Sequence, residues 1–222
     1  MSKISEAMLA EMDVMSEAEF LASVGLSKAA FLEEIAVAER AEVRAIAAEG
    51  KAAPDFSAHT LTPSGAISSE LFHLSELRGR PACLIFGCYT CPVFRRQTDR
   101  MKELIAAHQD AVQFVFVYVL ETHPTDGWNT KSNEAANIMY AQPITLEDRA
   151  AVARDWRAAF DIRSPIVLDW PDNRINDDYA GTPERLYVLD TQGVVTFKSE
   201  QGPYYDDHLE DWAAALVQVR AS

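Results

Sequence analysis

The chain lacks any cluster of basic residues. Its 222 residues contain 20 lysines and arginines against 34 aspartates and glutamates, which gives a net charge of −14 at neutral pH. Proteins that bind nucleic acid neutralise backbone phosphates with positive side chains. We therefore expect no nucleic-acid partner.

Long apolar segments are also missing. The opening stretch MSKISEAMLAEMDVMSEAEF carries scattered acids and no continuous apolar run, which predicts neither a signal peptide nor a membrane span. We expect a cytoplasmic protein with no membrane partner. Because 48% of the residues are hydrophobic, the chain is long enough for one well-cored domain with an extension.

Cysteines are few. Three cysteines in a reducing compartment argue against a framework of structural disulfides and favour reactivity, metal binding or plain burial. Cys83 lies in the apolar run PACLIF and is expected to be a buried strand residue. Cys88 and Cys91 form a C-x-x-C motif in the stretch GCYTCPVF.

A zinc site is not expected. One C-x-x-C motif supplies two of the four ligands that structural zinc needs. The histidines are scattered along the chain and form no second ligand pair; they are His59, His73, His108, His123 and His208. We predict neither a bound metal nor a bound cofactor.

Two parts of the chain differ in pattern. Residues 1–52 predict helices, with Ser16 and Glu19 as a capping box and Gly50 as the final C-cap. We expect this helical extension to pack on the main domain or on a second subunit, the second case giving a homodimer. Residues 53–222 predict a single domain in which strands alternate with helices.

The main domain predicts an α/β fold with a mixed central sheet flanked by helices. Strands are expected at 84–86, 113–120, 164–168, 185–189 and 194–198, the last two forming a hairpin across DTQG. Helices are expected to begin at Pro92, after Thr145 and within the acidic run 206–211.

Cys91 lies directly before the helix that begins at Pro92, since proline suits the first helical position. The positive end of a helix favours thiolate, and cysteines so placed have pKa values of roughly 3.5–7.5. Cys91 is therefore the candidate nucleophile. In thioredoxins the first cysteine of the motif begins the helix, whereas here the second does. Cys88 is either the cysteine that resolves oxidised Cys91 or a bystander.

Several segments resemble thioredoxin-like and peroxiredoxin-like domains. These are APDF at 53–56, LSELRGRP at 74–81, and the apolar strand followed by Cys-Pro. Thr182-Pro183, just before the strand ERLYVLD, resembles the proline loop of the same fold. The resemblance implies a thioredoxin-like fold and a cis proline at Pro183 that faces the cysteine loop.

A second resemblance is more specific. FGCYTCPVF is similar to the iodothyronine deiodinase signature, in which selenocysteine precedes the proline, and VYVLETHPTDGW at 117–128 resembles the second signature of that family. Later family segments are matched in order by LEDR, DNRINDDY, ERLYV and QGPYY. The match covers about residues 53–217.

The resemblance to deiodinases implies roles for several residues. Cys91 takes the place of selenocysteine, the atom that attacks the substrate. Glu121 and His123 lie where the family handles protons and binds substrate, and Arg185 would help to hold the charged end of the substrate. An exposed ion pair is the alternative for Arg185, and a hydrogen bond to Glu121 or Asp126 is the alternative for His123.

Three further residues near the motifs are candidates for substrate binding. Thr90 either bonds the thiolate or caps the helix. Trp128 either forms a pocket wall or packs on the base of its loop. Pro183 belongs to the proline loop that faces the cysteines.

The chain also departs from the family pattern. Sulfur replaces selenium, so we expect slower dehalogenation. The cysteine that the family places two residues before its selenocysteine is Tyr89 here, and Pro143 stands where many members have histidine.

We predict a thiol-dependent oxidoreductase in which Cys91 attacks the halogen of a small iodinated aromatic molecule. Regeneration would come from Cys88 or from an external thiol such as thioredoxin or a low-molecular-weight thiol. A thiol peroxidase in the same fold is the first alternative. A redox sensor or binding module without turnover is the second.

Overall fold

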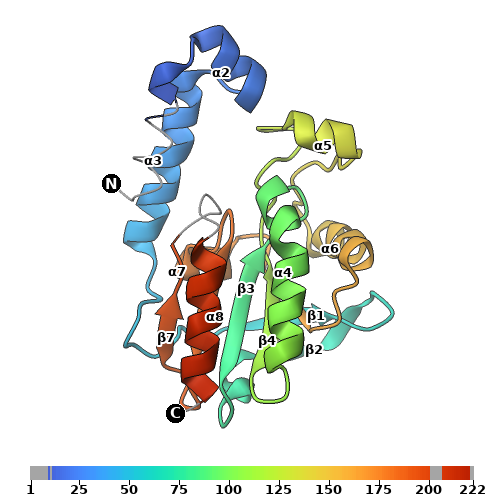
Figure 1. Cartoon of the computed structure of the whole chain (residues 1–222). Coiled ribbons are helices and arrows are strands. Elements are labelled where there is room, and N and C mark those ends of the chain that lie inside the picture. The colour runs from blue at the N-terminus through green and yellow to red at the C-terminus, as the bar shows by residue number, and fades with distance from the viewer. Residues whose placement is uncertain (1–9, 11, 201–206, 221–222) are drawn as a thin grey trace.

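A mixed sheet organises the computed structural model, which describes residues 10, 12–200 and 207–220 (Figure 1). Its strand order is β2-β1-β5-β4-β3-β6-β7. Strands β3, β4 and β5 run parallel, while β1 and β6 pair antiparallel to their neighbours. The strands are β1 (Ser57–Leu61), β2 (Ile67–His73), β3 (Ala82–Gly87), β4 (Gln113–Tyr118), β5 (Ile166–Leu168), β6 (Arg185–Leu189) and β7 (Val195–Lys198).

Helices cover both faces of this sheet (Figure 1). Helices α4, α6 and α8 lie on one face, and the short α7 lies on the other. The helices are α2 (Glu17–Val24), α3 (Lys28–Arg44), α4 (Pro92–His108), α5 (Lys131–Ala136), α6 (Leu146–Phe160), α7 (Arg174–Tyr179) and α8 (Asp207–Arg220), with a 3₁₀ turn η1 (Leu74–Leu77). This is the predicted α/β architecture.

Strand alternation sorts the core into two layers, because successive side chains of a strand point to opposite faces. Cys83 and Ile85 of β3 pack toward α4, α6 and α8. Leu84 and Phe86 pack toward α7. Both faces of β3 are therefore buried, which explains its uninterrupted apolar run.

The N-terminal extension packs on the main domain of its own chain. Phe20 and Phe31 form a small apolar cluster with Met12, against which Trp128 of the main domain lies. The Trp128 indole Nε1 donates to the Val24 carbonyl at 2.9 Å, and the Lys131 Nζ donates to the Ala22 carbonyl at 2.6 Å. The homodimer stays a prediction.

Several features of the fold differ from the sequence predictions, among them the short helices α5 and α7, which were not predicted. Helix α3 ends at Arg44 and not at Gly50, because the backbone N–H groups of Ile46 and Ala47 donate to the Asp178 carbonyl. Gly50 has a φ of 75° and forms a turn instead. The β1–β2 hairpin at the sheet edge was not predicted, since its strands alternate irregularly between buried and exposed residues.

The other predicted strands and helices are confirmed. Most of their ends lie within one or two residues of the predicted positions. Ser16 and Glu19 form the expected capping box, and Thr145 caps α6. The QGPYY segment lies outside the described residues. In the part of the chain that the structure covers, no helix is both long and apolar enough to cross a bilayer.

Candidate active site

Cys91 is the N-cap of α4, as predicted. Its backbone is extended (φ −76°, ψ 108°), Pro92 occupies the first helical turn, and the Phe94 N–H donates to the Cys91 Sγ at 3.5 Å. The helix thus presents its free N–H groups to the sulfur. The Cys91 residue is, however, only 2% exposed.

Burial outweighs the effect of the helix start on the pKa of the Cys91 thiol. Removal from water raises the Cys91 pKa well above its usual value, and the charges of Cys88 and Glu184 raise it further. The N–H groups of Phe94 and Val93 lower it by less. The predicted low pKa is therefore wrong, because one helix terminus does not offset full desolvation of a thiolate. Cys91 rests as a thiol at neutral pH.

Cys88 follows the last residue of β3 and is also buried. Its Sγ lies 3.2 Å from the Thr122 Oγ1 and accepts from the Thr122 N–H at 3.3 Å. Burial, followed by the charge of Glu121, raises the pKa of Cys88 to about 12. Cys88, Cys91 and the buried strand residue Cys83 are all free thiols.

Glu121 connects the cysteine loop to the loop that follows β4. One oxygen, Oε2, accepts the Thr90 N–H at 2.9 Å and the Thr90 hydroxyl at 2.8 Å, and Oε1 accepts the Tyr118 hydroxyl. Gln142 forms two hydrogen bonds with the Glu121 backbone, each of 2.9 Å. Its Oε1 accepts the Glu121 N–H, and its Nε2 donates to the Glu121 carbonyl. Burial raises the pKa of Glu121, and these hydrogen bonds counteract part of the rise.

His123 adjoins the same network. Its backbone N–H donates to the Thr90 hydroxyl at 3.1 Å, and its ring Nδ1 lies 3.1 Å from the Trp128 carbonyl. A carbonyl only accepts, so Nδ1 carries the proton and Nε2 of the neutral ring is an acceptor. Burial lowers the pKa of His123 to about 4. The Trp128 carbonyl, and neither Glu121 nor Asp126, holds the ring.

Trp128 lies between His123 and the N-terminal extension. Its ring meets that of His123 edge-on at 4.4 Å and that of Phe31 at 5.9 Å between centroids. The indole N–H is bonded to Val24 in α2. Trp128 therefore packs on its loop and on the extension at once.

Asn133 in α5 joins this group and was not predicted as a site residue. It is fully buried, and its Nδ2 donates to the Thr90 carbonyl at 2.9 Å. Its Oδ1 accepts from the Arg95 Nη1 at 2.8 Å, and the same Nη1 donates to the Tyr89 carbonyl at 2.9 Å. The only sequence signal was Arg95, which lies one helical turn after Cys91.

Arg185 lies on the other face of the sheet from Cys91. Its neighbour Leu186 packs in the layer that contains Cys91, so Arg185 points away from that layer. The Arg185 guanidinium is buried, pairs with Glu42 of α3 at 2.6 Å and donates to the Ser199 carbonyl at 3.0 Å. This placement differs from the substrate contact that the resemblance implied.

The Thr182-Pro183 peptide bond is cis, as predicted. Glu184 follows it directly. In the antiparallel register Phe86 pairs with Arg185, so one further step places Glu184 opposite Gly87, next to Cys88. Glu184 was not among the predicted site residues, because no apolar-polar alternation in ERLYV marks which of its side chains face the cysteine loop.

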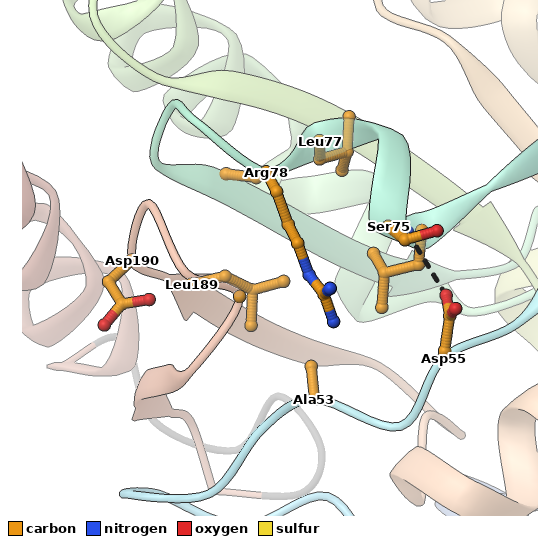
Figure 2. A pocket seen from close by; sticks show the side chains of 10 residues that line it. Ala53, Asp55, Ser75, Leu77, Arg78, Leu189 and Asp190 are labelled. Atoms are coloured by element: carbon orange, nitrogen blue, oxygen red, sulfur yellow. Dashed lines mark hydrogen bonds between the residues drawn. The ribbon is translucent and has the colours of Figure 1, made fainter.

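A small hollow of about 20 Å³ lies at the other end of β3 (Figure 2). Ala82, the first residue of that strand, lines it, whereas the loop that carries Cys88 and Cys91 follows the last residue, Gly87. The Arg78 side chain extends across it between Asp55 and Asp190 (Figure 2). The hollow is thus separate from the thiols. Over the described ranges, no group of three or more His, Cys, Asp or Glu residues is arranged to hold a metal ion.

A family model and several relatives of known function match most of the chain. The family model described as iodothyronine deiodinase matches residues 23–218. The type I iodothyronine deiodinase of Xenopus laevis is 34% identical over 146 residues, 64% of this chain and 55% of the relative. The human thyroxine 5-deiodinase is 30% identical over 166 residues, 74% of this chain and 52% of the relative. The chain spans about half the length of these relatives.

Solved structures agree on the fold. A putative protein disulfide isomerase from Bacteroides thetaiotaomicron superposes with a TM-score of 0.55 at 17% identity, over 80% of this chain and 92% of that one. A thioredoxin-like superfamily protein gives a TM-score of 0.55 at 14% identity, over 78% and 98%. The thioredoxin-like fold predicted from the sequence is confirmed.

Proposed function

The chain belongs to the iodothyronine deiodinase family, and we propose that it is a thiol-dependent oxidoreductase that removes iodine from an aromatic substrate. One observation carries the proposal. Cys91 caps α4 beside a buried network of Thr90, Glu121 and His123. A sulfur nucleophile and groups that accept and return a proton are what reductive dehalogenation requires.

In the first step, the Cys91 sulfur gives up its proton and attacks the iodine of the substrate. A sulfur–iodine bond forms, the carbon–iodine bond breaks, and its electron pair stays on the aromatic carbon, which takes up one proton. The sulfur is oxidised and the carbon is reduced. The products of this step are the deiodinated ring and a sulfenyl iodide on Cys91.

His123 is our candidate for moving that proton. The neutral ring has Nε2 free to accept, because Nδ1 donates to the Trp128 carbonyl. In this assignment His123 first takes the proton of the thiol and then delivers it to the carbon. Glu121 fixes Thr90, whose hydroxyl accepts the His123 backbone N–H, and so positions the ring.

In the second step, another thiol attacks the Cys91 sulfur. A sulfur–sulfur bond forms, iodide leaves, and the attacking thiol loses its proton. We assign this role to Cys88, which shares the buried cysteine loop, or to an external thiol. Two further thiol equivalents then reduce a Cys88–Cys91 disulfide, whereas a mixed disulfide with an external thiol needs only one more. Thioredoxin or a low-molecular-weight thiol in the cytoplasm would supply them.

Thr90, Pro183 and Trp128 are our candidates for the substrate contact. Thr90 precedes the sulfur in sequence, Pro183 begins the segment beside the cysteine loop, and the Trp128 ring covers His123. We do not place Arg185 in this set, because its guanidinium is held by Glu42 and Ser199.

The test compares the wild type with Cys91→Ser. Each is incubated with an iodothyronine, an iodotyrosine and a panel of peroxides in the presence of dithiothreitol, and iodide release and peroxide loss are measured. We expect iodide release from the wild type only. Iodide release that survives in Cys91→Ser would overturn the site, and rapid peroxide loss without iodide release would favour a thiol peroxidase. No turnover of either class would favour a redox sensor.

A further inference from the structure

Thr122 makes two contacts with the sulfur of Cys88 that the mechanism above does not use. Its backbone N–H donates to the Cys88 Sγ at 3.3 Å, and its Oγ1 lies 3.2 Å from the same atom. A buried cysteine ordinarily behaves as a small apolar side chain with weak hydrogen bonding. Two polar groups directed at one sulfur are therefore more than packing requires.

The sheet sets the position of Thr122. The Val119 N–H donates to the Gly87 carbonyl at 3.2 Å, so the pairing of β3 with β4 continues past the end of β4. The chain then runs beside the cysteine loop. Thr122 reaches the sulfur of Cys88 there, and the residues on either side of Thr122 bond to Thr90. The contact with Cys88 thus depends on the backbone of the core.

Thr122 supplies the hydroxyl that is available to a Cys88 thiolate, which can only accept hydrogen bonds. The Thr90 Oγ1 lies 3.9 Å from the Cys88 Sγ, but it donates its proton to Glu121. Within the part of the chain that the structure describes, the Thr122 hydroxyl has no partner except this sulfur, so its proton can turn to Cys88. Burial, followed by the charge of Glu121, raises the pKa of Cys88, and the bonds from Thr122 lower it.

The two cysteines differ in this respect. Cys88 and Cys91 pack in the same layer of the core, at the C-x-x-C spacing that is typical of redox pairs. The Cys91 Sγ accepts only the more distant Phe94 N–H, at 3.5 Å, among the hydrogen bonds of the described residues. None of these bonds joins Thr122 to Cys91. Thr122 therefore acts on Cys88 and not on the proposed nucleophile.

We propose that Thr122 is a positioning residue that prepares Cys88 to attack the oxidised Cys91 sulfur. In that step the Cys88 S–H bond breaks and a sulfur–sulfur bond forms. The group on Cys91 leaves with the electron pair of its bond to sulfur, and the proton of Cys88 is released with it. Cys88 is oxidised, and the Cys91 sulfur is reduced. The donors of Thr122 hold the Cys88 sulfur in place and stabilise its negative charge as the proton leaves.

The proposal rests on the role of Cys91 as the reacting sulfur, and hydrogen peroxide tests it without an iodinated substrate. Peroxide oxidises Cys91 to a sulfenic acid. Attack by Cys88 then gives the disulfide and water, whereas a second peroxide gives the sulfinic acid, which thiols do not reduce. Peroxide is raised until Cys91 is consumed, and both products are counted by peptide mass spectrometry. The peroxide concentration that gives equal amounts of the two products measures the rate of attack by Cys88.

In Thr122→Val that concentration should fall roughly three- to tenfold. The change keeps the shape of the side chain and the backbone N–H but removes the hydroxyl. A rise of one pKa unit lowers the thiolate fraction of Cys88 about tenfold, and the greater nucleophilicity of a more basic thiolate offsets part of this loss. The rate at which Cys91 is consumed should not change, because Thr122 makes no hydrogen bond to Cys91.

Four variants serve as controls. Thr122→Ser keeps the hydroxyl and should restore the wild-type balance of products. Thr125→Val removes the hydroxyl of an exposed threonine in the same loop and should leave the balance unchanged. Cys88→Ser should give the sulfinic acid and no disulfide. Thr122→Ala also removes the hydroxyl, and it takes the place of Thr122→Val if circular dichroism shows that the valine variant does not fold.

Several results would overturn this role of Thr122. One is an unchanged balance of products in folded Thr122→Val, and another is a change that Thr122→Ser does not reverse. Equal slowing of Cys91 consumption would show a merely structural role. A wild type that forms no disulfide, or that carries the sulfinic acid on Cys88, would contradict the assignment of the two cysteines.

Failure of this proposal and failure of the proposed function can be told apart. Absence of iodide release together with an intact effect of Thr122→Val would count against deiodination only. Normal iodide release together with no effect of Thr122→Val would count against the role of Thr122 only.

Discussion

Thr90 donates both its backbone N–H and its hydroxyl to the same carboxylate oxygen of Glu121, at 2.9 and 2.8 Å. The residue that precedes the proposed nucleophile is therefore fixed to the loop that carries His123. Because the three groups are buried, their hydrogen bonds are not replaced by water when one is lost.

Thr90→Val should destabilise the protein. The change keeps the shape of the side chain but removes the hydroxyl that Glu121 accepts and that the His123 N–H donates to. Leaving buried polar groups unsatisfied costs about 1–3 kcal/mol in free energy of unfolding, measured by urea denaturation. Thr90→Ser keeps the hydroxyl and is the control. Equal stability of the two variants would mean that the network does not hold the loop.

His123 should make the protein less stable in weak acid. Its pKa is about 4 in the folded protein against about 6.5 in the unfolded chain. The unfolded state therefore binds more protons between these values, and stability is lost as pH falls from about 6.5 to 4. The loss should be on the order of 2–3 kcal/mol.

The measurement is urea denaturation across that pH range for the wild type and for His123→Gln. Buried carboxyl groups such as Glu121 and Asp169 have raised pKa values and act in the opposite direction. The difference between the two proteins cancels their effect. A wild-type curve that runs parallel to that of the variant would show that His123 does not titrate in this way.

Cys91 should react slowly with iodoacetamide at pH 7 when no substrate is present. Burial raises its pKa well above the usual value, so the thiolate fraction is smaller than that of free cysteine. The expected rate is at least about tenfold lower than for free cysteine, since one pKa unit changes the thiolate fraction tenfold. Alkylation faster than that of free cysteine would contradict this prediction and support the low pKa that the helix start alone predicted.

Arg185→Gln should affect stability more than substrate affinity. The buried guanidinium pairs with Glu42 of the extension, and removing it should cost about 2–3 kcal/mol, less than for a fully buried pair because Glu42 is 42% exposed. Glu42→Gln should cost less. Urea denaturation and KM for the substrate are measured together. A raised KM with unchanged stability would support the substrate contact implied by the family resemblance.

Local signals in the sequence were enough for the helix start at Cys91 and for the core strands. Pro92 and the apolar run before it define a strand, a loop and a helix without any distant contact. The same holds for the Ser16 capping box and for the hairpin around DTQG.

Properties that depend on tertiary packing could not be predicted from the sequence. The acidity of Cys91 is set by burial, which depends on how the whole layer closes over it. The faces of Arg185 and Glu184 were ambiguous, since every residue of β6 is buried and no apolar-polar alternation marks the sides. The bond between Trp128 and Val24 joins residues 104 positions apart, with no local signal for it.

The most direct test of the account is the iodide released in a single turnover without reductant. The reduced protein is mixed with excess iodinated substrate, and iodide is counted per chain for the wild type, Cys88→Ser and Cys91→Ser. We predict about one equivalent from the wild type, with a disulfide joining Cys88 and Cys91, and none from Cys91→Ser. A full equivalent from Cys91→Ser would contradict the claim that this sulfur attacks the substrate.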